Sequence, residues 1–136
     1  MVGLVTEEAE KELLNKLLHY YKKLYPGLTF DIKEETLSHR EIGEIYYTYP
    51  GEEAEATARE KMVMISEAIT HGYNTPIILL KKNNKKILLD GHRRIRVAYA
   101  QGLGWRAYVL AVKKEEIEFG IESMIMGKVA DLFSRE

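Results

Sequence analysis

The sequence predicts a single α+β domain, and three observations lead to that fold class. Stretches with apolar residues at helical spacing alternate along the chain with short apolar runs that are typical of buried strands. The chain has 136 residues, 46% of them hydrophobic, so it can build one ordinary core and is not expected to be disordered. No repeat, low-complexity tract or linker divides it. We therefore expect residues 1–136 to form one domain.

The first predicted helix covers residues 6–24. Thr6 is a suitable N-cap residue, and Pro26-Gly27 ends the helix. Its apolar face consists of Leu13, Leu14, Leu17, Leu18, Tyr21 and Leu24. The alternation in LTFDI then predicts a half-buried strand over residues 28–32.

The middle of the chain carries a weaker pattern. Residues 33–51 are expected to be irregular, with IYYTY forming either a short strand or a packed loop. Pro50-Gly51 predicts a turn, and a second helix is expected over residues 53–71, with Gly72 as its C-cap glycine.

The second half of the chain predicts a hairpin, a helix and a further strand. TPIILLKK and KILLD have the pattern of two strands joined by the turn sequence NNK. A helix is expected from about His92 to Gly102, and WRAYVLAV predicts another strand. Residues 115–133 carry apolar side chains at helical spacing and predict a last amphipathic helix, which Gly120 and Gly127 weaken.

Composition excludes several classes of protein. The absence of cysteine rules out disulfides, cysteine–zinc sites and a thiol nucleophile. No apolar run is long enough to cross a bilayer, and the first residues do not resemble a secretory signal, so a cytoplasmic protein is expected. Abundant Lys, Glu, Ile and Tyr beside a single glutamine are reminiscent of proteins from thermophiles.

Charge is divided along the chain and sums to −1. Residues 31–60 hold nine acidic side chains, whereas residues 81–96 hold seven basic ones. A protein that binds DNA through its phosphates usually has a clear basic excess. The distribution therefore favours a local anion site over a broad basic surface.

The basic cluster coincides with a junction between a strand and a helix, ILLDGHRRIR. A helix that starts after Gly91 presents unpaired N–H groups and the positive end of its dipole, and glycine lets a ligand approach the backbone. Arg93, Arg94 and Arg96 add donors that suit phosphate oxygens. The alternative is that these arginines cover a solvated helix face or pair with the acidic region.

The stretch LLDGHRRIRVAYAQGLG, preceded by HGYNTPIILL, resembles the ParB/sulfiredoxin superfamily over roughly residues 28–112. In that family a DGHHR or GERRxR loop forms a nucleotide pocket. The resemblance implies a small mixed β-sheet flanked by helices, and the helices predicted at the two ends of the chain lie outside the matched region. It also implies nucleotide binding by Asp90, Gly91, His92, Arg93, Arg94 and Arg96.

Three chemistries are known in that family. Sulfiredoxins use a cysteine in this loop, where this chain has His92 and no cysteine, so that activity is excluded. Partition proteins bind CTP and clamp DNA with a downstream helix-turn-helix domain, for which the chain leaves no room. The third group contains kinases and NTPases, including an archaeal free-serine kinase with a DGHHR loop; here Arg93 replaces the second histidine.

The resemblance to the kinases implies a catalytic glutamate after the first strand. Glu41 is the closest positional match, with Glu44 and Glu35 as substitutes, although for any single one of them we favour a solvated acidic loop. His92 is expected to donate to a phosphate oxygen or to carry a proton. Asp90 either binds Mg²⁺ or, as we favour, holds the loop through backbone N–H groups.

The sequence thus predicts a nucleotide-binding protein that uses ATP or ADP (CTP being possible) with Mg²⁺. It would act as a phosphotransferase on a small hydroxyl-bearing acceptor or as an NTPase, and no protein-held metal site is expected. One alternative is a nucleotide-switched binding module without catalysis. Another is a ParB-like DNA-binding or nuclease accessory, which the charge disfavours. A homo-oligomer formed through the first helix is possible.

Overall fold

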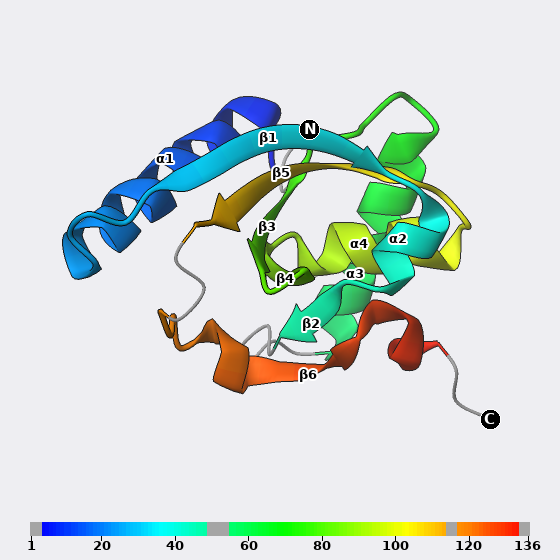
Figure 1. Cartoon of the computed structure of the whole chain (residues 1–136). Helices are drawn as coiled ribbons and strands as arrows, with labels where there is room; N and C mark the ends of the chain where they lie inside the picture. Colours follow the sequence, from blue (N-terminus) through cyan, green and yellow to red (C-terminus); the bar gives the residue numbers. More distant parts are fainter. Residues whose placement is uncertain (1–3, 49–54, 114–116, 134–136) are drawn as a thin grey trace.

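The computed structural model of the chain describes residues 4–48, 55–113 and 117–133 (Figure 1). These residues form an α+β structure in which four α-helices accompany one six-stranded sheet. Its elements are α1 (Glu7–Leu24), β1 (Phe30–Leu37), α2 (His39–Gly43), β2 (Tyr46–Thr48), α3 (Glu55–Ile69), β3 (Ile77–Lys82), β4 (Lys85–Asp90), α4 (His92–Ala100), β5 (Trp105–Val112), the 3₁₀ helix η1 (Ile121–Met124), β6 (Ile125–Lys128) and the 3₁₀ helix η2 (Val129–Leu132). Within the described part of the chain, no helix is long and apolar enough to cross a membrane.

The sheet is mixed, as expected. Its strands lie in the order β1-β5-β3-β4-β2-β6. The pairs β3–β5 and β2–β4 are parallel, whereas β1–β5, β3–β4 and β2–β6 are antiparallel. The predicted hairpin is confirmed: β3 and β4 are joined by Asn83 and Asn84, whose φ angles of 53° and 64° suit a tight type I′ turn.

Each face of the sheet carries its own core. Successive residues of a strand point to opposite faces, so Ile77 and Leu79 belong to one core and Ile78 and Leu80 to the other. Side chains of α2 and α4 complete the first core, and side chains of α1 complete the second. Figure 1 shows the same layers, with α1 on one side of the sheet and α2, α3 and α4 on the other.

The first two predicted helices are confirmed with small changes of boundary. The Thr6 hydroxyl accepts a hydrogen bond from the Ala9 amide (3.1 Å), which caps α1 as the sequence indicates. The second helix is observed over Glu55–Ile69. Residues 53 and 54 of the predicted helix, and the predicted turn at Pro50-Gly51, lie outside the described residues.

Two predictions of local structure are wrong. Residues 33–48 are regular, because β1 continues to Leu37 and α2 follows at once, with Ser38 and Glu41 forming a capping box. The expected helix over 115–133 is not formed in its described part, residues 117–133, which contain η1, β6 and η2. Gly120 and Gly127 adopt φ angles of 86° and 139°, which interrupt a helix, and β6 instead pairs with β2.

Candidate functional site

The junction predicted to bind an anion is formed as expected from a strand, a glycine and a helix. β4 ends at Asp90, Gly91 has a φ of 110°, and α4 begins at His92. A Cβ on Gly91 would meet side-chain atoms of Ile77. The turn therefore needs glycine, both because a side chain would not fit and because φ is positive. Within the described ranges no side chain caps α4 through a hydrogen bond, so its first amide groups remain available to a ligand or to water.

A pocket of about 180 Å³ opens at this helix start. Its polar wall consists of Lys61, Asp90, Gly91, His92, Arg93 and Arg94. Its apolar wall consists of Leu4, Val5, Ile65 and Tyr73. A second hollow of about 330 Å³ shares Leu4, Val5 and Tyr73 with it, so the segment that precedes α1 separates the two spaces.

Arg94 lies in the interior and is held by two carboxylates. Its Nη2 atom donates to Oε2 of Glu10 on α1 and to Oδ2 of Asp90 on β4, both at 3.0 Å. The Arg94 side chain is 4% exposed and that of Glu10 is 1% exposed. Among the described residues, the Nη1 atom of Arg94 has no hydrogen-bond partner. A buried guanidinium donor without an acceptor is unusual, and Arg94 lines the pocket.

The carboxyl of Glu10 has an unusual environment. Burial raises its pKa well above 4.5, and a hydrogen bond with the Asp90 side chain raises the pKa further, whereas the Arg94 charge lowers it. Glu10 and Asp90 are thus two carboxyl groups that share one cation. Sequence reasoning missed Glu10, because it lies 84 positions from its partner Arg94.

His92 is the first residue of α4 and lines the same pocket. Its Nε2 atom lies 3.1 Å from the hydroxyl of Thr48, and that hydroxyl donates its only hydrogen to the Leu88 carbonyl (2.9 Å). Nε2 must therefore carry a hydrogen and donate to Thr48, which leaves Nδ1 as a proton acceptor. Burial lowers the pKa of His92, so the ring is neutral at pH 7.

The other basic residues of the site differ in position. Arg93 is half-buried on the pocket wall, whereas the half-buried Arg96 is not one of the residues that line it. Lys61 reaches the pocket from α3 and was not predicted. Nothing in the local sequence marks Lys61, because only the packing of α3 against α4 brings it to the junction.

Glu41 lies in a different pocket, of about 370 Å³. That pocket is lined by Arg40, Glu41, Glu44, Tyr46, Asn84, Lys85, Lys86 and Lys128. Lys86 in this pocket and Asp90 in the other are four residues apart on β4, which corresponds to about 13 Å at the usual strand rise. The structure therefore does not bring Glu41 to the start of α4.

The Glu41 carboxylate also has a structural task. It accepts a hydrogen bond from the Ser38 amide (2.9 Å), and this bond lowers its pKa. Its neighbour Glu44 is bound by Lys128 at 2.8 Å. Glu35, the other proposed substitute, lies on β1.

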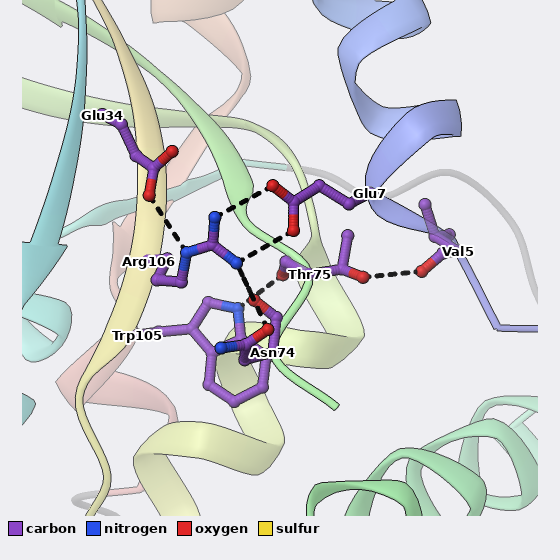
Figure 2. Close-up of polar contacts among 7 residues, drawn as sticks. All are labelled: Val5, Glu7, Glu34, Asn74, Thr75, Trp105 and Arg106. Atoms are coloured by element: carbon purple, nitrogen blue, oxygen red, sulfur yellow. Dashed lines mark hydrogen bonds and ion pairs between the residues drawn. The ribbon is translucent and has the colours of Figure 1, made fainter. Parts of the chain in front are cut away.

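A network around Arg106 holds the segment that walls the pocket (Figure 2). Arg106 on β5 binds both carboxylate oxygens of Glu7 at 3.0 Å and also binds Glu34 on β1 at 3.0 Å. The Val5 carbonyl accepts hydrogen bonds from the hydroxyls of Thr75 (2.9 Å) and Tyr73 (2.8 Å). The wall formed by Leu4 and Val5 is thus fixed to the sheet by polar contacts.

The described residues contain no group of three or more His, Asp or Glu side chains that could hold a metal ion. The chain matches no model of a known protein family, and no curated protein matches it significantly.

Proposed function

We propose that this protein binds a phosphate-bearing ligand, with ATP or ADP as the leading candidates, at the start of α4. One observation carries the proposal: the uncapped end of α4 opens on a pocket whose wall includes Lys61, Arg93 and Arg94. Backbone amides, a favourable helix dipole and fixed cations together form a site for an anion. The resemblance to ParB/sulfiredoxin-like nucleotide pockets remains part of this proposal.

The unpaired Nη1 atom of Arg94 gives independent support. Nearly all buried donors in folded proteins have an acceptor, and Nη1 has none among the described residues. The two carboxylates that bind Arg94 both contact Nη2, so neither of them accepts a hydrogen bond from Nη1. An oxygen atom of a bound phosphate is a suitable acceptor for it.

The pocket is large enough for the phosphate part of a nucleotide but not for the whole molecule. A space of about 180 Å³ holds a phosphate group but is smaller than typical ligand sites of roughly 300–1,000 Å³. The rest of a nucleotide would extend out of the pocket along its apolar wall, where Leu4, Val5 and Tyr73 offer apolar and aromatic contacts. A Mg²⁺ ion would then be held mainly by the phosphates of the ligand.

Turnover is a separate step of the proposal. Of the two predicted catalytic residues, His92 lines the phosphate pocket and Glu41 does not. As the proton acceptor for phosphate transfer to a hydroxyl group, or for hydrolysis, Nδ1 of His92 is therefore better supported than Glu41. The rival function is a nucleotide-switched binding module, in which the ligand binds without being turned over.

Calorimetry with ATP, ADP, AMP, CTP and inorganic phosphate, with and without Mg²⁺, tests the binding site. Arg93→Ala should weaken binding roughly ten- to hundredfold, because it removes a charge-assisted contact to an anion. Arg96→Ala is the matched control, since Arg96 lies on the same helix but is not among the lining residues. Binding of none of these compounds by the wild type would overturn the proposal.

A phosphate-release assay with the same nucleotides separates the two functions. Release that falls at least tenfold in His92→Gln, but not in Glu41→Gln, would identify the enzyme and its base. Tight binding with no release in the presence of Mg²⁺ would instead identify the binding module.

A further inference from the structure

Beneath the proposed site lies a group of three charged side chains from three elements, two of which, Glu10 and Arg94, are buried, whereas the Asp90 side chain is 35% exposed. Glu10 comes from α1, Asp90 from the end of β4 and Arg94 from the first turn of α4. Both carboxylates contact the same atom, Nη2 of Arg94, at 3.0 Å. Asp90 and Arg94 line the pocket, whereas Glu10 is not one of the lining residues and would reach a ligand only through them.

Among the described residues, the surroundings of Glu10 supply no second cation. The charged and titratable groups that face it from the elements packed against α1 are Asp90, Arg94 and the hydroxyl of Tyr108 on β5. The nearby Arg106 of β5 is engaged by Glu7 and Glu34. The strand β3 contributes the apolar Ile78 and Leu80 to this core.

Two ionised carboxylates with one guanidinium would leave this group with a net charge of −1, which is costly because Glu10 and Arg94 are buried. One proton removes that charge, since a neutral Glu10 can donate a hydrogen bond to the Asp90 carboxylate. Burial and this bond raise the pKa of Glu10 to about 8, so it carries the proton at pH 7. The group is then electrically neutral, with one cation facing one anion.

We propose that Glu10 is a positioning residue for the anion site, and that the proton on the Glu10–Asp90 pair is required for strong anion binding at the start of α4. This inference rests on the proposed function. Glu10 and Asp90 together bind Nη2 of Arg94 and so fix its guanidinium group at the wall of the pocket, while the buried Nη1 has no partner among the described residues. When the proton leaves to solvent, an uncompensated negative charge remains one side chain away from the bound anion.

The direction of the pH dependence follows from the charge of the three side chains. Above the pKa of Glu10 they carry a net charge of −1 and repel the ligand, so the affinity for the anion falls as pH rises from 7 to 9. By reciprocity, a bound anion stabilises the protonated pair and raises the pKa of Glu10. The change in affinity should be about tenfold, which is typical for one added charge close to a dianion at a partly buried site.

Sulfate is a suitable probe, because it resembles phosphate and does not titrate between pH 6 and 9. Carbon-13 NMR of glutamate-labelled protein follows the Glu10 carboxyl through this range, in sodium sulfate and in sodium chloride of equal ionic strength. We expect the Glu10 carboxyl to titrate at higher pH in sulfate. An unchanged Glu10 titration in a protein that binds sulfate would overturn the linkage.

Variants give a second readout, the dissociation constant of sulfate at pH 7 and pH 9. Glu10→Gln keeps a neutral hydrogen-bonding side chain at every pH, so it should bind as the wild type does at pH 7 and lose the tenfold decrease at pH 9. Glu10→Ala should bind sulfate weakly at both pH 7 and pH 9, because Arg94 loses one of the two carboxylates that fix its position. Glu12→Gln is the matched control on α1, since Glu12 is exposed and is not one of the residues that line the pocket.

These outcomes separate the inference from the proposed function. Other groups that titrate in the same range, the α-amino group included, remain in Glu10→Gln. A full tenfold decrease in that variant would therefore overturn the role of Glu10 while leaving the site intact. Failure of the wild type to bind sulfate at pH 7 would overturn the anion site itself, and the linkage with it.

Discussion

A Cβ atom on Gly91 would lie 2.3 Å from Cγ2 of Ile77, closer than any side chain tolerates. Gly91→Ala therefore combines this overlap with the strain of a φ of 110°, and we expect it to lower the free energy of unfolding by about 3 kcal/mol. Urea denaturation measures the loss. Gly72→Ala is the control, since Gly72 has a φ of 92° but open space around it, and it should cost only about 1 kcal/mol. Equal losses would mean that Ile77 moves aside.

Arg106→Lys tests the polar network that fixes the start of α1. Lysine keeps the charge but cannot bind Glu7 through two parallel hydrogen bonds while also binding Glu34, so we expect a loss of about 1–2 kcal/mol in urea denaturation. Hydrogen exchange should accelerate in the first turns of α1. The exposed pair of Asp31 and Lys33, 3.8 Å apart, provides the control: Asp31→Asn should change stability by less than about 0.5 kcal/mol.

The same network gives a pH dependence in the acid range. The hydrogen bond from Arg106 lowers the pKa of Glu7 in the folded protein. A lowered carboxyl pKa contributes stability above the unfolded value of about 4.5, and that contribution disappears as pH falls through the folded value. The wild type should therefore lose more stability than Arg106→Lys between pH 5 and pH 3. Parallel losses would show that the Glu7 pKa does not depend on Arg106.

Lys82 holds the segment that was wrongly predicted as helix. Its ammonium group is buried, donates to the Ile117 carbonyl and contacts Oε2 of Glu122 at 2.6 Å. Lys82→Met leaves Glu122 without this partner, so we expect a loss of about 2–4 kcal/mol by thermal denaturation. Adding Glu122→Gln should restore part of it. Lys81→Met, on the same strand, is the control and should have a small effect; an equal effect would mean that the buried ion pair is not the cause.

Elements with a local signal were predictable from the sequence. Thr6 caps α1 within three residues, and the Asn83-Asn84 turn fixes the register of its hairpin, so neither depends on distant contacts. The prediction ended β1 too early, because β1 is an edge strand whose mostly exposed residues lack the alternation of a half-buried strand. A signal for α2 was present and missed, since Ser38 and Glu41 have the spacing of a capping box.

Contacts between distant segments were not predictable. Residues 125–128 form a strand only because β2 offers them a partner, and no local pattern encodes that pairing. The Gly91 turn could be placed from its residues, but the burial of Arg94 against Glu10 could not. A burial pattern read from one helix cannot reveal a carboxylate that arrives from another element.

Thr48→Val tests the state of His92 in the candidate site. The Thr48 hydroxyl donates to the Leu88 carbonyl and receives Nε2–H of His92, so valine leaves two buried polar groups unpaired and should cost about 1–3 kcal/mol. Nitrogen-15 NMR at pH 7 should show the Nε2–H tautomer in the wild type and a mixture in the variant. Thr70→Val is the control, since the exposed hydroxyl of Thr70 donates to the nearby Glu67 carbonyl at the end of α3.

The pH dependence of the wild type checks the same residue. Because burial lowers the pKa of His92, its neutral form contributes stability above the unfolded value of about 6.5, and this contribution disappears as pH falls through the folded value. His92→Gln should remove this part of the acid destabilisation. A wild-type ring that carries its hydrogen on Nδ1 at pH 7, or that titrates above pH 6.5, would contradict the assignment and remove His92 as the proton acceptor for phosphate chemistry.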